Sequence, residues 1–134
     1  MNTRMLVTVS AAIEAATGVA LIAVPELVAR MLLGAELSSS GMAVARVAGL
    51  GLLSLGIACW PGGEDTSQQA NRALFVYNLL AGLYLGYLRV GGGFTGYLLW
   101  PACVFHVLMA LLFARPAFAR VRQRILLDKG TAGS

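Results

Sequence analysis

Charged residues, cysteine and histidine are all scarce in this sequence. Of its 134 residues 12% are charged, and the chain holds two cysteines and one histidine. So low a charged fraction excludes an ordinary soluble protein, in which about a quarter of all residues are charged. The cysteines form no CxxC pattern, and one histidine with two separated cysteines makes neither a His/Cys cluster for zinc nor a haem-attachment motif. The sequence therefore predicts no metal site.

Hydrophobic residues, by contrast, make up 58% of the chain and gather in four runs. The runs cover about residues 5–23, 41–60, 73–90 and 96–114. Each approaches the roughly 20 apolar residues that cross a hydrocarbon core. We therefore predict an all-α integral membrane bundle of four transmembrane helices at 1–115, with a basic C-terminal tail at 116–134. Because Glu14 interrupts the first run and no clear cleavage site follows, we expect a retained helix there and not a signal peptide.

The connector at 24–40 has a helical pattern of its own. Pro25 comes where the first span should end, and Glu26 and Arg30 lie opposite an apolar face. That face consists of Leu27, Val28, Met31 and Leu32. The pattern predicts a short amphipathic helix on the outer membrane surface. Ser38 to Ser40 then predict the start of the second span, because serine is a preferred helix cap.

The other connections and the small residues suggest packing and not chemistry. A polar loop at 61–72 and a glycine turn at 91–93 contain no catalytic pattern. Small residues recur every four positions in two spans. They are Gly41, Ala45 and Gly49 in the second span, and Gly82 and Gly86 in the third. This spacing favours close helix packing in membranes.

The basic residues predict an orientation. If both termini lie inside, that side holds seven basic residues: Arg4, Arg72, Arg115, Arg120, Arg122, Arg124 and Lys129. The outer side then holds Arg30 and Arg89. Since basic residues accumulate on the cytoplasmic side, we expect both termini in the cytoplasm. The formal net charge of +4 follows from this topology and does not indicate nucleic-acid binding. Cys59 and Cys103 would then lie on opposite sides, too far apart for a disulfide.

The basic tail has two interpretations. Phe118, Val121 and Ile125 share one face of a helix, surrounded by arginines. We expect Arg115, Arg120, Arg122 and Arg124 to bind anionic lipid headgroups, each contributing about 1 kcal/mol. The alternative is a docking helix for a soluble partner.

Glu14 is the residue that the apolar pattern leaves unexplained. The seven Leu, Ile and Val residues of 5–23 each favour insertion by about 0.3–0.6 kcal/mol, whereas a central acidic residue costs about 2.5–3.5 kcal/mol. The two contributions nearly cancel, so Glu14 needs a proton or a partner inside the bundle. Arg46 is the candidate partner, about 8 to 9 Å away along the membrane normal. Alternatively, Arg46 extends toward the outer surface and Glu14 stays neutral.

Further polar residues fall at similar depths. They are His106 in the fourth span and Tyr77, Asn78 and Tyr84 in the third, while Ser10 and Gly18 share the Glu14 face. We predict a buried polar centre formed by Glu14, Arg46, His106, Asn78, Tyr77 and Tyr84. It is either a clasp that fixes helix register or a ligand or proton site, and no catalytic constellation is present.

Three stretches resemble the DoxX-like group of small bacterial four-helix membrane proteins. They are "GVALIAVPELVARMLLG", "ARVAGLGLLSLGIACW" with its arginine and glycines, and "LLWPACVFHVLMALLF", within residues 10 to 113. The resemblance implies the bacterial inner membrane. Some members are associated with quinone-linked sulfur oxidation, so it makes quinone the one cofactor to consider, although no redox signature is repeated here.

Glu14 and its alanine-rich surroundings also resemble helix one of the small multidrug resistance transporters, whose glutamate exchanges protons for a cationic drug. The long connector and Arg46 depart from that pattern. A permanent cation near Glu14 would compete with a cationic substrate, which argues against that mechanism.

Two functional hypotheses remain. The first is a non-enzymatic accessory or assembly subunit, or a scaffold, that forms a homo-oligomer or joins a larger membrane complex. The second is a proton-coupled transporter or a lipid- or quinone-binding protein, with Glu14, Arg46 and His106 at its site. An oxidoreductase subunit would rest on family analogy alone.

Overall fold

Four helices of the protein are long and apolar enough to cross a membrane. The computed structural model describes residues 2–62 and 68–131, with side chains as far as residue 118. In these ranges it contains five helices and no strand: α1 (Thr3–Ala23), α2 (Pro25–Leu33), α3 (Ser39–Ala58), α4 (Gln68–Val90) and α5 (Leu99–Thr131). The candidate spans are α1, α3, α4 and the Leu99–Phe118 part of α5. The predicted all-α fold with four such helices is confirmed.

Helix boundaries follow local chemistry. The Asn2 side chain accepts a hydrogen bond from the Arg4 N–H, and the Ser38 hydroxyl accepts one from the Gly41 N–H. Both residues thereby satisfy backbone donors of a first helical turn. Pro25 opens α2, where its missing N–H costs nothing. The predicted serine cap and the predicted break at Pro25 are confirmed.

Two predicted boundaries were wrong. Helix α4 begins at Gln68, so the last five residues of the expected loop 61–72 are helical. Helix α5 begins at Leu99, three residues after the expected start of the span. Hydropathy alone missed the first turns of α4 because they are polar.

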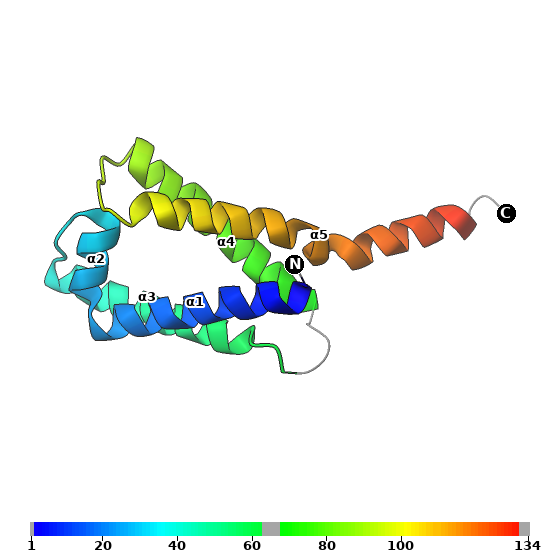
Figure 1. Ribbon diagram of the computed structural model, residues 1–134, viewed down its shortest axis with the longest axis horizontal. Coiled ribbons are helices and arrows are strands. Elements are labelled where there is room, and N and C mark those ends of the chain that lie inside the picture. Colours follow the sequence, from blue (N-terminus) through cyan, green and yellow to red (C-terminus); the bar gives the residue numbers. More distant parts are fainter. Residues whose placement is uncertain (1, 63–67, 132–134) are drawn as a thin grey trace.

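The four long helices associate as two pairs. Helix α1 packs along α3, and α4 packs along α5, whereas contacts between the pairs are few. Figure 1 shows the pairs converging near the N-terminus and spreading apart toward α2, which lies at the opposite end. We call these the N-terminal end and the α2 end of the bundle.

Glycines bring the helices of each pair close together. A Cβ atom added at Gly18 would lie 2.7 Å from the Gly49 carbonyl oxygen, and one at Gly56 would lie 2.7 Å from that of Ala11. These contacts join α1 to α3. In the other pair, a Cβ at Gly82 would meet Val107 at 3.0 Å. The small residues that pack α3 against α1 are thus seven residues apart and not four.

Helix α2 links the two pairs at its end of the bundle. Gly34 ends α2 in the left-handed conformation, with φ 70°. The loop before α5 then binds the last turn of α2, because Leu98 donates to the Met31 carbonyl at 2.9 Å and Thr95 donates to the Leu33 carbonyl at 3.3 Å. Helix C-termini leave such carbonyls without partners. The predicted amphipathic helix is therefore present, and its C-terminal carbonyl groups bind the loop at 91–98.

The start of α4 holds α5 where Pro116 interrupts the helical hydrogen bonds. Gln68 donates to the carbonyls of Pro116 and Ala117 at 2.9 and 2.5 Å, and Arg72 donates to that of Ala117 at 3.1 Å. Helix α5 continues through Pro116 to Thr131 and extends beyond the other helices (Figure 1).

Replacement of Gly56 by alanine should separate α1 from α3. The new Cβ meets backbone atoms, which cannot rotate away, so we expect a loss of about 1–3 kcal/mol in the free energy of unfolding. Gly51→Ala is the matched control in the same helix, because nothing lies within 4 Å of a Cβ there. The measurement is unfolding in mixed detergent micelles. Equal effects of the two substitutions would contradict the close contact.

Candidate functional site

A layer of polar side chains crosses the interior of the bundle about halfway along α1. On its N-terminal side lies an apolar core that includes Leu6, Val7, Leu74, Met109 and Phe113. The layer itself contains Ser10, Glu14 and Asn78, whose side chains are at most 1% exposed. Tyr77 and His106 are half-buried beside them. Polar groups removed from water in this way require hydrogen-bond partners.

Asn78 is the centre of the hydrogen bonds in this layer. Its amide nitrogen donates to the Leu74 carbonyl at 2.8 Å and to the Ser10 hydroxyl at 3.3 Å, and its amide oxygen lies 2.9 Å from His106 Nδ1. A backbone carbonyl can only accept, so Leu74 fixes which end of the amide is nitrogen. His106 Nδ1 must then carry the proton. In the neutral ring Nε2 is consequently an acceptor.

Glu14 meets Tyr77 and not a cation. The Tyr77 hydroxyl is a polar side-chain group that lies close enough to the Glu14 carboxyl to interact with it. Glu14 Oε1 is buried without any partner among the described residues. The Tyr77 ring packs edge-on against His106, with the ring centres 5.6 Å apart. Tyr77 therefore connects the carboxyl of α1 to the imidazole of α5.

A cavity of about 450 Å³ opens on the α2 side of this layer. Its walls come from both helix pairs and from α2. They include Ile13, Thr17 and Leu21 of α1, Val28 and Leu32 of α2, Ala81 and Leu85 of α4, and Ala102 and Phe105 of α5. Tyr77 and His106 also line it. The volume falls within the range of about 300–1,000 Å³ that small-molecule sites occupy.

The polar groups at this cavity determine what it can bind. In the neutral ring His106 Nε2 is an acceptor. The Tyr77 hydroxyl lies beside Glu14, and its oxygen can accept a hydrogen bond whenever its proton is donated to an ionised Glu14. Such a pair complements a ligand that carries hydroxyl groups. If Glu14 takes up a proton, Tyr77 becomes free to donate, and a carbonyl oxygen becomes the complementary group. The protonation state of Glu14 thus determines whether the site complements a hydroxyl group or a carbonyl oxygen of the ligand.

Arg46 does not join Glu14, and that predicted pairing was wrong. Arg46 is exposed and lines a separate groove with Pro25 and Glu26. The reason is the register of α3. Because Gly49 is level with Gly18, Arg46 lies roughly 10 Å closer to the α2 end than Glu14 does. Glu14 instead points toward α4.

Tyr84 also lies outside the polar layer. Its side chain is 62% exposed and stacks on Tyr87, with ring centres 6.4 Å apart. Two helical turns separate it from Tyr77, and it contributes to the cavity wall only. Of the predicted buried centre, the structure therefore brings together Glu14, Tyr77, Asn78 and His106.

The predicted headgroup residues are described only in part. Arg115 is exposed on α5, as a headgroup contact requires. The side chains of Arg120, Arg122 and Arg124 lie outside the described residues.

The sequence pattern did not predict the burial of Asn71 or the partner of Ser10. Asn71 is buried, and its amide oxygen has no partner among the described residues. It belongs, with Gln68 and Arg72, to a stretch that polarity assigned to a loop. Ser10 was expected on the Glu14 face from its i−4 spacing, but only the tertiary structure identifies Asn78 as its partner.

In comparisons with known proteins, no family model, no curated protein and no solved structure matches this chain. Within the described residues, no group of three or more His, Cys, Asp or Glu side chains could hold a metal ion. Both cysteines are free and buried: Cys59 packs in the apolar core, and Cys103 donates to the Gly82 carbonyl at 3.5 Å.

Glu14→Gln and Arg46→Gln should have additive effects on stability. The two side chains share no contact, and substitutions at such sites add to within about 0.5 kcal/mol. A double-mutant cycle of thermal unfolding in detergent measures this. A coupling energy above about 1 kcal/mol would contradict this prediction and would indicate that Glu14 and Arg46 interact directly.

Asn78→Ala should destabilise the bundle more than Ser10→Ala does. The first removes the partner of His106 and leaves a buried donor unsatisfied, at a cost of about 1–3 kcal/mol, whereas the second removes one hydrogen bond of about 1 kcal/mol. Detergent unfolding of both variants tests the order. If Ser10→Ala were the more harmful, Asn78 would not be the centre of the layer.

Proposed function

We propose that this protein binds a hydroxyl-bearing amphipathic molecule inside the membrane, of the quinol or glycerolipid class. The observation that carries the proposal is the cavity between the helix pairs, which is lined by both His106 and Tyr77. The apolar walls suit a hydrocarbon tail or ring, and the two acceptors suit the polar end of the molecule.

Three features support a binding site over a simple helix clasp. Glu14 has no ionic partner in the described chain, and one of its oxygens is unpaired. A clasp would be expected to pair such groups, since an unsatisfied buried carboxylate is costly. In addition, the helix pairs spread apart toward α2 (Figure 1), and the cavity lies on that side of the polar layer.

The proposed setting is the bacterial inner membrane with both termini in the cytoplasm. At the N-terminal end of the bundle lie Arg4, Arg72 and Arg115, whereas Arg30, Arg46 and Arg89 lie toward the α2 end. The four further basic residues of the tail follow the N-terminal end of the bundle in the sequence, and this excess supports that orientation. The likeness to DoxX-like proteins belongs to the same proposal, and four helices with an amphipathic segment after the first support it.

A role as an accessory subunit is the second candidate. Helix α3 buries only Gly49 and Gly56 among its own residues, while Val44, Val47, Leu50 and Ile57 are exposed. Such a face suits lipid or another membrane subunit, including a second copy. The two candidates are compatible, because an accessory subunit can hold the bound molecule.

The test uses a short-tailed hydroquinone, kept reduced under anaerobic conditions, and its dimethyl ether, which lacks the O–H donors. We expect the purified protein to bind the hydroquinone about tenfold more tightly than the ether, since each lost hydrogen bond at a buried acceptor costs roughly that factor. His106→Phe should reduce the difference, because only the Tyr77 oxygen then remains as an acceptor. Equal affinity for both compounds would contradict the assignment of the two acceptors.

Filling the cavity supplies an independent check. Ala102 lines the cavity, so Ala102→Phe should block binding by occupying the space. Val104→Phe is the control, because Val104 lies two residues away, is 50% exposed and does not line the cavity. If Ala102→Phe bound the hydroquinone as the parent does, the site would lie elsewhere.

A further inference from the structure

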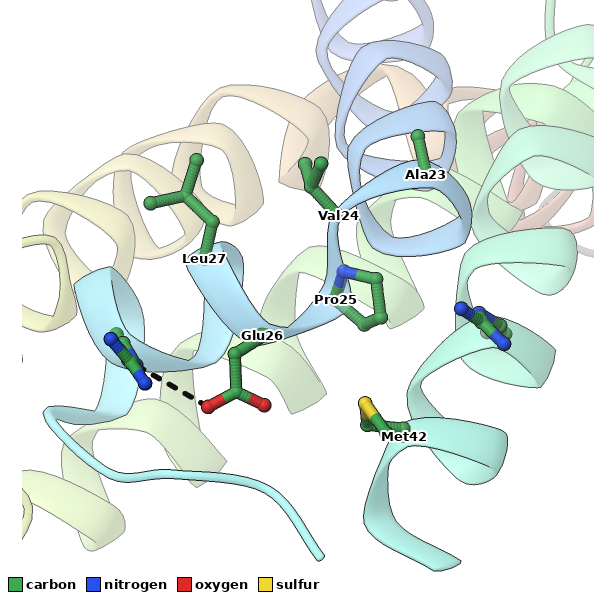
Figure 2. A pocket seen from close by; sticks show the side chains of 8 residues that line it. Ala23, Val24, Pro25, Glu26, Leu27 and Met42 are labelled. Carbon is green, nitrogen blue, oxygen red and sulfur yellow. Dashed lines mark hydrogen bonds and ion pairs between the residues drawn. The ribbon is translucent and has the colours of Figure 1, made fainter. Parts of the chain in front are cut away.

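A second groove lies at the α2 end, between the start of α2 and the start of α3. It has a volume of about 430 Å³ and is lined by Val24, Pro25, Leu27 and Met42 together with Glu26, Arg30 and Arg46. Figure 2 shows Glu26 directed into the space between the two helices, with Met42 facing it from α3. None of these residues lines the cavity proposed above, so the two sites are separate.

The charges in this groove are unequally satisfied. Arg30 binds Glu26 at 3.3 Å and Glu36 at 2.9 Å, so its charge is fully compensated. Arg46 takes part in no ion pair or side-chain hydrogen bond among the described residues. Glu26 uses Oε1 for Arg30, which leaves Oε2 available. The groove therefore offers one free guanidinium and one free carboxylate oxygen.

The position of the groove matches the membrane interface. It lies where α1, a candidate span, ends and α2 begins. Arg46 is about 10 Å along α3 from its start, a depth from which an arginine can reach a headgroup. Val24 and Leu27 on the rim are 46% and 54% exposed, which provides an apolar surface for an acyl chain.

We propose that this groove binds the headgroup of phosphatidylethanolamine, with the phosphate on Arg46 and the ammonium on Glu26. Arginine binds phosphate through paired N–H donors, and a primary ammonium donates to a carboxylate. A quaternary ammonium, as in phosphatidylcholine, has no N–H for Glu26. The headgroup of phosphatidylglycerol has no cation, so Glu26 repels it. Charge complementarity thus favours the ethanolamine headgroup over the other two.

The experiment measures lipids retained by the full chain in detergent. The delipidated protein is mixed with micelles that contain equal amounts of the three phospholipids, and native mass spectrometry counts the bound molecules. We expect phosphatidylethanolamine to be enriched about tenfold over the others, the factor for one charge-assisted hydrogen bond. Equal retention of all three lipids, or a preference for phosphatidylglycerol, would overturn the proposal.

Matched variants separate the two halves of the headgroup. Arg46→Gln should lower retention of phosphatidylethanolamine about tenfold, because the phosphate loses its partner. Glu26→Gln should remove the preference over phosphatidylglycerol, and the fold survives this change because Glu36 still holds Arg30. Arg89→Gln is the control, since it removes the same charge at the α2 end outside the groove.

Three other outcomes would reject the proposal. Arg89→Gln could lower retention as much as Arg46→Gln does, which would indicate general electrostatic attraction. Arg46→Gln could leave retention unchanged, as expected if Arg46 pairs directly with Glu26. Finally, Arg46→Gln could convert a dimer to a monomer without changing lipid retention, which would assign the groove to a second copy of the chain.

Discussion

A carboxyl group inside an apolar helix has to find its hydrogen-bond partners on other helices, and the interior of this protein is organised around that requirement. Glu14 of α1 meets Tyr77 of α4, Tyr77 packs against His106 of α5, and His106 binds Asn78, which returns to Ser10 of α1. These contacts link the two helix pairs at the point where the apolar core between them ends. The apolar core lies on one side of the circuit and the cavity on the other.

The cavity exists because the two pairs meet at the N-terminal end and spread apart toward the α2 end, where α2 bridges them. Gly18, Gly49 and Gly56 bring α1 and α3 into backbone contact, so these two helices pack closely along their length. At the N-terminal end the pairs share the apolar core. At the α2 end the 91–98 loop binds the last turn of α2. From the apolar core toward α2 the pairs diverge, which leaves room for a ligand beside the polar layer.

Hydropathy was sufficient to predict the four spans, because about 20 apolar residues in a row have few other uses. It failed at the start of α4, where Gln68, Asn71 and Arg72 are polar yet helical. The partners of Gln68 and Arg72 lie on α5, far away in sequence. The pairing of Glu14 with Arg46 failed for a related reason. Opposite charge and similar depth suggested it, but the register of α3 is set by its glycines, and no charge pattern reveals that register.

The sequence by itself therefore determined the all-α fold, the four apolar spans, the break at Pro25, the cap at Ser38 and the presence of one costly carboxyl group at Glu14. These are local properties, fixed by hydropathy, backbone chemistry and the cost of burying charge. Only the tertiary structure decided which helices pair, which groups meet Glu14, and where a cavity and a groove remain. Those depend on the helix register, which close contacts between residues distant in the sequence establish.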